Sequence, residues 1–485
     1  MKKKYGLLKI LTIMTLLIVV ATYFIKGRNG SIQYLPLLDV ILNYIQAYYV
    51  FFDTAMFIFV IGGFYGFLNR VPAYKKLVKN IANKFSDKSK IFVIITTIIF
   101  ALLSSLTGLN ILLLLFVPFA ISIILLLGYD KLVAISATVG GIIAGFIGGI
   151  FLTTKQGSSY YGTTYTTIDK LVGLESHWGN LFPKVLLLVV VTGLLIFYII
   201  SHIKKIEAKT VNYKLTKSDN LFVEVKDRQG KIVKVDDSKV RTWPLIIILF
   251  ILLIILTLGY LPWNALFKID CFEKFHTWLI GLKIGDFAVF TNLVSNIITA
   301  FGTWASLGSY MVGIIVLIIL MFIIMLIYRV KFEDAMDGFV YGAKKMIPAT
   351  IIAMLALCIF ICCYNNGFIE TIITNAGKEF GDNAIIHSLL TALGSILHVD
   401  LYYTSSSIFT TITGTLTSTA NLSIYAVMFQ SIYGLVQLVG PTSIILIIVI
   451  SYLDVPYTTW LKYIWRFIIQ LIIVILIVLM IVSLL

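Results

Sequence analysis

The chain has 485 residues, of which 59% are hydrophobic and only 13% are charged. A soluble domain of this length has about half apolar and about a quarter charged residues, so a water-soluble core could not cover this apolar surface. The composition therefore excludes a soluble protein and predicts a chain that lipid solvates.

The net charge of +15 does not indicate a nucleic-acid partner. The basic residues stand in blocks between apolar segments, as in the cytoplasmic loops of membrane proteins, and attraction to anionic lipid is a secondary effect. The spacing of the four cysteines does not match a disulfide framework, so we expect no disulfides. The five histidines are scattered without the spacing of metal ligands, so we expect no metal site.

At the N-terminus, three lysines precede an apolar run at 7–25. A signal peptide begins in the same way, but Val20-Ala21-Thr22-Tyr23 is a poor cleavage site, so we expect a retained first membrane helix. Further runs long enough to span a bilayer follow at 47–69, 131–152, 183–203, 243–262, 308–328, 347–363, 422–440 and 461–485.

Four other apolar segments are interrupted by Gly, Ser or Thr: 91–128, 286–302, 384–420 and 441–453. Such interruptions predict discontinuous helices or re-entrant hairpins. Together, the segments predict an all-α polytopic membrane protein with about ten to twelve membrane segments.

Loop charges predict the orientation. The loop 70–90 holds seven basic residues and one acid, and segment 204–241 holds eleven basic and six acidic residues. The positive-inside rule places both loops and the N-terminus in the cytoplasm of a multi-pass cell-membrane protein. Both loops lie on one side only if 91–128 crosses an even number of times, which favours a hairpin there.

Segment 204–242 divides the chain into two transmembrane halves, 1–203 and 243–485. Within this cytoplasmic linker, the alternating stretches 222–226 and 231–235 predict a small β-hairpin.

The two halves repeat one order of features. In the first half, Asn69 follows a span, and an amphipathic stretch leads to a polar break at 104–108. In the second half, Asn366 follows a span, and an amphipathic stretch again leads to a break, at 404–407. Counting spans puts the two copies on opposite sides of the membrane, so we predict inverted repeats with the site at the midplane.

Polar clusters at the breaks are the candidate binding groups. A helix break inside the membrane frees backbone N–H and C=O groups, which are tolerated where they line a wet cavity or bind a solute. Helix N-termini attract carboxylates, and freed carbonyls with hydroxyls coordinate Na⁺. The alternative is that these small residues serve close helix packing. The clusters are Ser104, Ser105, Thr107 and Asn110; Thr153, Thr154, Ser158 and Ser159; Thr404 to Ser407; and Pro441, Thr442 and Ser443.

Two charges adjoin these clusters. Lys155 could neutralise a substrate carboxylate and Asp400 could bind a cation or a proton, because a charge inside the membrane is costly and by default a functional candidate. The alternative is an interfacial position, with Lys155 extending to water. Motifs of nucleophilic, P-loop and dinucleotide chemistry are missing, which predicts that the chain is not an enzyme.

Four passages of the chain match motifs of a known family. They are Phe59 to Asn69, Gly128-Tyr129-Asp130, Thr404-Ser405-Ser406-Ser407, and Gly440-Pro441-Thr442-Ser443 followed by Val455-Pro456-Tyr457-Thr458-Thr459-Trp460-Leu461-Lys462. The last pattern is the most specific. From about residue 47 to residue 485, the chain resembles the anaerobic C4-dicarboxylate carrier family, the DcuC/YfcC-like group of the ion-transporter superfamily.

The resemblance implies inverted repeats with re-entrant hairpins, a homodimer, and ion-coupled uptake or exchange of carboxylate-bearing solutes. The chain departs from the family at several positions. Asn110 stands where an acid is frequent, Thr153-Thr154 replaces Asn-Pro, and Ile408 and Ile444 replace glycines. These departures leave the substrate open, although the loss of acids favours an anion.

We therefore predict a secondary active transporter of a small carboxylate, either a C4-dicarboxylate or an amino acid, coupled to Na⁺ or H⁺ or working by exchange, with no other cofactor. One alternative is a Na⁺/H⁺ antiporter that uses Asp53 or Asp400, and another is a lipid-modifying membrane enzyme, for which the clustered acids are missing. The predicted substrate- or ion-binding residues are Asn69, Thr107, Asn110, Thr153, Thr154, Lys155, Ser158, Ser159, Asn366, Asp400, Ser405, Ser406, Ser407, Pro441, Thr442 and Ser443.

Overall fold

Over the residues that it describes, the computed structural model is mostly helical, which confirms the predicted helical class, and it adds two small pairs of strands. The predicted β-hairpin at 222–235 and most of the linker lie outside the described residues. The structure describes residues 6–25, 33–156, 164–174, 180–208, 240–294, 299–304, 310–397, 401–416 and 422–484.

Helices of the first half begin and end at recognisable residues. Pro72 in the first turn of α4 has no N–H to lose there, and the Asp130 side chain caps α7 by accepting from the N–H of Val133 at 2.8 Å. The elements are α1 (Gly6–Phe24), α2 (Leu37–Val50), α3 (Phe52–Leu68), α4 (Pro72–Lys84), α5 (Ser89–Thr107), α6 (Val117–Leu126), α7 (Lys131–Ile135), α8 (Gly141–Ile147), β1 (Thr153–Gln156), β2 (Thr164–Thr167), α9 (Ile168–Leu171) and α10 (Leu181–Glu207), with a 3₁₀ turn at Leu112–Leu115 and a π-helical turn at Ser136–Gly140.

The second half contains the longest helix of the described chain, α16, which continues through Pro348. Its elements are α11 (Trp243–Tyr260), α12 (Trp263–Phe267), α13 (Cys271–Gly281), β3 (Lys283–Ile284), β4 (Phe287–Ala288), α14 (Val289–Leu293), α15 (Met311–Ile327), α16 (Phe332–Asn365), α17 (Phe368–Phe380), α18 (Ala384–Leu397), α19 (Leu401–Tyr403), α20 (Thr410–Gly414), α21 (Leu422–Val439), α22 (Ile444–Tyr452) and α23 (Tyr457–Leu484), with a π-helical turn at Thr404–Phe409.

Seven helices of the described chain are long and apolar enough to cross a membrane, or eight if α2 and α3 form one bent span. Those two helices meet at an angle of 65° around Phe51, so the continuous span predicted at 47–69 is in fact broken. The predicted number of membrane segments is reached only if shorter apolar helices such as α6, α15 and α18 also enter the membrane.

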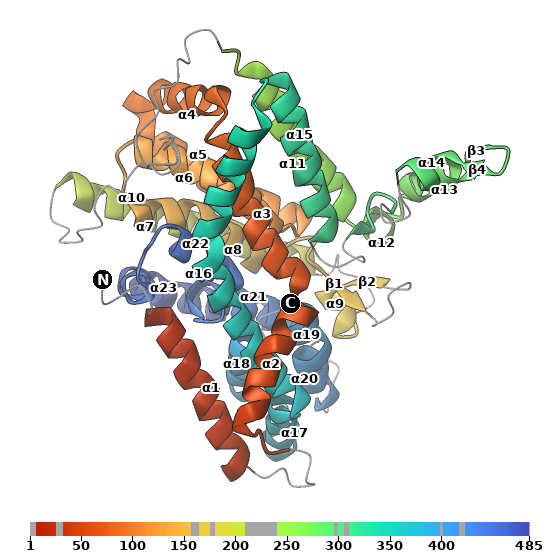
Figure 1. Cartoon of the computed structure of the whole chain (residues 1–485). Coiled ribbons are helices and arrows are strands. Elements are labelled where there is room, and N and C mark those ends of the chain that lie inside the picture. Colours follow the sequence, from red (N-terminus) through yellow and green to blue (C-terminus); the bar gives the residue numbers. More distant parts are fainter. Residues whose placement is uncertain are drawn as a thin grey trace.

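The two halves cross where α3 and α16 pass side by side in the centre of the molecule (Figure 1). Gly62 and Gly66 on α3 face Gly338 and Gly342 on α16, which makes a GxxxG motif on each helix. A Cβ added at Gly342 would lie 2.0 Å from the carbonyl oxygen of Gly62. The backbones therefore touch without side chains between them, as in close pairs of membrane helices.

Other contacts between the halves surround this crossing. Helix α21 packs on α8, α23 packs on α10, and α22 packs on α16. In Figure 1, α4 lies above the crossing and α17 to α20 lie below it. The core that positions the site is therefore built from both halves of the chain.

An arm formed by α12 to α14 and the hairpin β3–β4 projects from the body (Figure 1). The segment 286–302, predicted as an interrupted membrane segment, begins instead with β4 and the short helix α14. Gly285, with φ of 60°, allows the tight turn between β3 and β4, and this turn directs the chain into a hairpin.

Candidate substrate and ion site

The first helix break lies where α5 ends. Gly108 has φ of 67°, a left-handed conformation that ends the helix. Ser104 Oγ donates to Oδ1 of Asn110 at 2.5 Å, and Thr107 Oγ1 donates to the carbonyl of Leu103 at 2.5 Å. Two predicted residues, Thr107 and Asn110, therefore lie together in one tight polar turn.

Ser105 joins this break to the end of α8. Its buried hydroxyl donates to the carbonyl of Gly148 at 2.7 Å, and its own carbonyl accepts from the N–H groups of Ile150 at 3.1 Å and Phe151 at 3.2 Å. The approach is close, because a Cβ on Gly145 would lie 2.1 Å from the carbonyl oxygen of Ala101. Two ends of broken helices thus satisfy each other's backbone groups.

Gln430 on α21 binds the same end of α8 from the second half of the chain. Its Nε2 donates to the carbonyls of Phe146 at 3.2 Å, Ile147 at 3.0 Å and Gly149 at 3.0 Å. The side chain is 1% exposed, and its Oε1 has no hydrogen-bond partner within the described residues. Three carbonyl oxygens therefore converge on one amide group in the interior. Gln430 was not among the residues predicted from the sequence, although a glutamine inside an apolar helix is a signal of its own.

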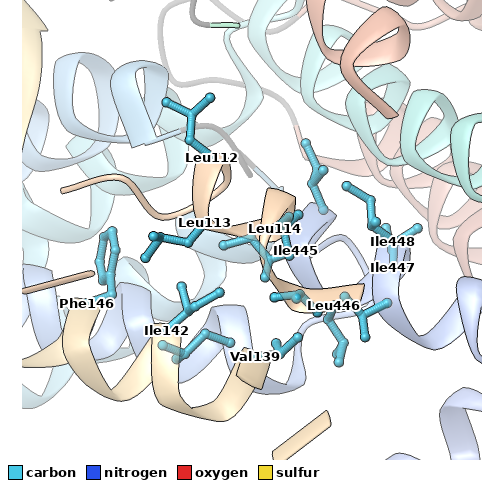
Figure 2. Close-up of a cluster of buried hydrophobic side chains, with 14 of the residues drawn as sticks. Leu112, Leu113, Leu114, Val139, Ile142, Phe146, Ile445, Leu446, Ile447 and Ile448 are labelled. Atoms are coloured by element: carbon cyan, nitrogen blue, oxygen red, sulfur yellow. The ribbon is translucent and has the colours of Figure 1, made fainter. Parts of the chain in front are cut away.

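An apolar layer borders these polar contacts. Figure 2 shows side chains of the 3₁₀ turn Leu112–Leu115, of α8 and of α22 gathered into one buried cluster, with Leu113, Ile142, Phe146 and Leu446 among them. Such packing excludes water, so the polar groups of the breaks act in a medium of low dielectric where each interaction is strong.

The second helix break separates α21 from α22 at Gly440 to Ser443. Thr442 Oγ1 donates to the carbonyl of Ile396 at 2.7 Å, which joins the break to the end of α18. The Ser443 side chain caps α22 by accepting from the N–H of Leu446 at 3.4 Å. Thr442 and Ser443 are each 1% exposed. The predicted residues Pro441, Thr442 and Ser443 therefore form a buried helix N-terminus.

Two residues of the Val455-to-Lys462 motif donate hydrogen bonds to the carbonyls at the end of α21. Trp460 Nε1 donates to the carbonyl of Leu438 at 3.0 Å, and the Tyr457 hydroxyl donates to the carbonyl of Val439. Trp460 is fully buried. The motif is thus explained by the need to satisfy helix-end carbonyls next to the break.

The predicted cluster Thr404 to Ser407 lies in the π-helical turn Thr404–Phe409. Thr404 and Ser405 are fully buried, Ser406 is exposed and Ser407 is half-buried. Ser407 Oγ donates to the carbonyl of Tyr403 at 2.7 Å, while the hydroxyls of the two threonines that follow donate to the carbonyls of Ser406 and Ser407. Turns of this kind are frequent at functional sites.

Asn69 and Asn366 occupy equivalent positions at the C-terminal ends of α3 and α16, where each serves as the C-cap. Asn69 lines a small pocket with Tyr341 and Lys345 on α16. Asn366 is buried, and its Nδ2 has no partner within the part of the chain that the structure describes. The two asparagines thus mark the ends of the crossing helices rather than the breaks.

Six predicted residues belong to segments that the structure describes in part or not at all. Thr153, Thr154 and Lys155 form strand β1, which pairs antiparallel with β2 beyond the end of α8. Ser158, Ser159 and Asp400 lie outside the described residues.

A buried ion pair lies at the start of α10. Lys184 Nζ contacts Oδ2 of Asp169, and the two side chains are 3% and 0% exposed. Asn180 Nδ2 donates to the other carboxylate oxygen of Asp169 at 2.9 Å. This pair was not predicted from the sequence, although a lysine at the start of an apolar span indicates a charge that needs a partner.

Two further carboxylates lie near helix ends. Asp130 Oδ2 is 3.0 Å from Nε2 of His202 on α10. Asp53, the candidate of the antiporter alternative, is half-buried in the first turn of α3 and accepts from the N–H of Thr54 at 2.8 Å. Both positions suit a carboxylate at a helix N-terminus.

Comparison with known proteins identifies the family. The family of DcuC C4-dicarboxylate anaerobic carriers matches residues 9–484. No curated protein matches the chain. Among solved structures, it is similar to the Alcanivorax borkumensis YdaH transporter, with 13% identity, a TM-score of 0.38, and coverage of 97% of this chain and 96% of that chain. The family match covers nearly the whole chain, which confirms the resemblance found in its motifs. The chain therefore belongs to the DcuC family of C4-dicarboxylate anaerobic carriers and is a multi-pass membrane transporter, not an enzyme.

Proposed function

We propose that the protein is a secondary active transporter that moves a C4-dicarboxylate across the cell membrane, coupled to Na⁺ or H⁺ or by exchange. One observation carries the proposal: two buried, polar helix breaks each form a hydrogen bond with the end of another helix and border an apolar core. The turn 104–110 contacts the end of α8, and the break 440–443 contacts the end of α18. Family membership supports the class of substrate.

A carboxylate would bind at the N-terminus of α22. The first turn of a helix leaves backbone N–H groups without helical acceptors, and the helix dipole favours negative charge there. Thr442 and Ser443 add buried hydroxyls at the same point. Because Thr442 donates its proton to the carbonyl of Ile396, Ser443 is the hydroxyl that would donate to the carboxylate. The second carboxylate of the substrate would be bound by the hydroxyl-rich turn Thr404–Phe409, which we also assign to the substrate.

A coupling cation would bind at the C-terminal end of a helix, here α8, where backbone carbonyls point outward. The carbonyls of Phe146, Ile147 and Gly149 converge on one point, which the Gln430 amide group occupies. Carbonyl oxygens are preferred ligands of Na⁺, and rotation of the amide would replace the N–H group by Oε1 as a fourth oxygen. Gln430 would then alternate between two states. In one its amide N–H groups occupy this position, and in the other its Oε1 binds the cation there.

We further propose that the halves 1–203 and 243–485 are inverted repeats, with the loops 70–90 and 204–241 in the cytoplasm. The order of elements supports this: a long helix, an amphipathic helix, a broken helix pair and a second break occur in both halves. The homodimer implied by the family resemblance also stays a prediction, which cross-linking in native membranes would test.

The transport proposal is tested by counterflow in proteoliposomes. Vesicles loaded with unlabelled succinate should accumulate labelled succinate, and external fumarate or malate should compete. The substitution Thr442→Val removes one buried hydrogen bond at the substrate position, so we expect counterflow to fall by about tenfold, the equivalent of about 1.4 kcal/mol. The matched control is Thr277→Val, which alters an exposed threonine on the projecting arm.

Each alternative function predicts a different result in these transport assays. Counterflow of labelled aspartate or arginine, without counterflow of succinate, would assign an amino-acid substrate. A pH change driven by Na⁺ without any organic solute would assign an antiporter. Wild-type vesicles that exchange no dicarboxylate under a Na⁺ gradient, a pH gradient or counterflow conditions would refute the proposed function.

A further inference from the structure

The projecting arm carries an amphipathic helix, α13, that takes no part in the candidate transport site. None of its residues is buried. Trp278 is 59% exposed and Phe275 is 54% exposed, and the centroids of their rings lie 5.6 Å apart. Cys271 and Leu282 are also exposed, and spacings of three or four residues put all four side chains on one side of the helix. These four side chains form the outer face of α13.

Another side of α13 fixes the helix to the rest of the arm. Phe272 packs on Trp263 of α12 and on Phe301, at 5.7 Å and 6.0 Å between ring centroids. His276 meets the ring of Phe290 on α14 edge-on at 6.0 Å. Burial lowers the pKa of His276, so this side chain adds no charge at neutral pH. The arm therefore packs on a side of α13 that leaves the outer face largely uncovered by the described chain.

The charged side chains of α13 lie on a third side and have partners within the arm. Lys274 Nζ lies 2.6 Å from Oδ2 of Asp270, one helical turn away. The Glu273 carboxylate accepts from Nδ2 of Asn264 at 2.7 Å. Over residues 261–294, three lysines offset three acidic residues. Because the arm has no net charge, it has little attraction for a charged partner, and binding at the outer face must come from its apolar surface.

The arm leaves and rejoins the body at the end of a membrane span. Helix α11 has 18 residues, and its length of about 27 Å nearly matches the hydrocarbon core of about 30 Å. Only 33% of this span is buried, so lipid contacts most of its apolar surface. The N–H of Gly302 donates to the carbonyl of Gly259 at 2.9 Å, and the ring of Trp304 packs on that of Tyr260 at 5.9 Å. The base of the arm therefore lies at the bilayer surface, and α13 projects sideways from there (Figure 1).

We propose that the outer face of α13 is inserted into the surface of the lipid bilayer, so that the arm lies on the membrane as an interfacial helix. Amphipathic helices with Trp and Phe on the apolar face lie in the plane of the membrane, with this face about 5–10 Å deep at the boundary of headgroups and acyl chains. Trp278 suits this depth, because its ring is apolar and its N–H can reach the headgroups. Lipid is favoured over a second copy of the chain, because the bilayer already lies at the base of the arm and covers the face without assembly of two chains.

A fluorescent label on Cys271 tests the proposal in the full chain. The other three cysteines are buried, so an environment-sensitive maleimide should react with the wild type and not with Cys271→Ser. The labelled protein is placed in phosphatidylcholine nanodiscs with one copy in each disc. We expect the label to emit at shorter wavelength than the same label at Thr277→Cys in the Cys271→Ser chain, which lies on the charged side of α13. Spin-labelled lipid should quench it more when the spin label is near the headgroup than when it is at the chain end, because the insertion is shallow.

Three results would overturn the proposal. Equal emission and equal quenching at the two positions would show that the outer face lies in water. Shielding of Cys271 that appears only in discs with two copies would assign the face to a second copy of the chain instead of lipid. Loss of the lipid quenching at high salt would show that charges hold the arm, whereas an inserted apolar face should be insensitive to salt.

Trp278 gives a second measurement that needs no attached label. In nanodiscs of phosphatidylcholine brominated near the headgroup, bromine quenches the tryptophans that lie close to the membrane surface. Trp278→Phe keeps an aromatic ring on the outer face and should lower the quenched fraction of tryptophan fluorescence relative to wild type. Trp460→Phe removes a fully buried tryptophan and should not lower this fraction. An unchanged quenched fraction in Trp278→Phe would count against insertion of the outer face.

Discussion

The glycine crossing of α3 and α16 makes a sharp prediction about stability. In the substitution Gly342→Ala, the new Cβ would lie 2.0 Å from the carbonyl oxygen of Gly62. Carbon and oxygen atoms in close contact normally lie about 3.3 Å apart, so the helices must separate locally by about 1.3 Å. The obstacle is backbone on both sides, which cannot rotate away as a side chain could.

The loss in the free energy of unfolding follows from the packing contacts that such a separation removes. A leucine-sized side chain makes about 40–60 atom contacts of about 0.1–0.2 kcal/mol each, and a gap of 0.5–1 Å forfeits about a quarter to a half of each. Loosening one such side chain beside the crossing therefore costs about 1–6 kcal/mol. Measured costs of overpacking are about 1–3 kcal/mol, so we expect a loss in that range.

The measurement is thermal unfolding of purified protein in detergent. Gly193→Ala is the matched control, because Gly193 lies on α10 with no heavy atom within 4 Å of the added Cβ. Alanine stabilises a helix by about 0.5–1 kcal/mol relative to glycine, so the control should melt at or above the wild-type temperature. If Gly342→Ala and Gly193→Ala shift the melting temperature in the same direction, the inferred contact between the backbones is wrong.

Three further substitutions test contacts near the breaks. Gln430→Leu removes one donor from three carbonyls, of which only that of Phe146 still accepts from the N–H of Gly149, and it should destabilise the protein by about 1–3 kcal/mol, seen as a lower melting temperature. Asp169→Asn should lower the free energy of unfolding by about 3–5 kcal/mol, because it leaves Lys184 charged and buried. The double variant Asp169→Leu with Lys184→Met should recover most of this loss in the same melting assay. Ser105→Ala removes the donor to Gly148 and should lower the melting temperature by the equivalent of about 1 kcal/mol, with Ser201→Ala as the exposed control.

The positions of the breaks were predictable because strong local signals mark them. Gly108 takes the left-handed conformation that a helix end requires, and Pro441 cannot continue α21. The amphipathic helices α4 and α17 also lie where polar and apolar residues alternate with helical spacing. These features depend on neighbouring residues, so one sequence is sufficient to find them.

Contacts between the halves could not be predicted in the same way. Gln430 binds carbonyls 281 to 284 residues away, and no local pattern states which helix end it will meet. The bend at Phe51 has no glycine or proline to announce it.

The close crossing of α3 and α16 also has a consequence for biosynthesis. Gly338 follows Gly66 by about 270 residues, and at about 5–20 residues per second its synthesis comes roughly 14–54 s later. During that time α3 is in the membrane with its glycine face exposed, and the first half lacks the helix that completes its core. Lipid or the insertion machinery must cover this face until α16 arrives, so α3 reaches its final packing only after translation has passed well into the second half.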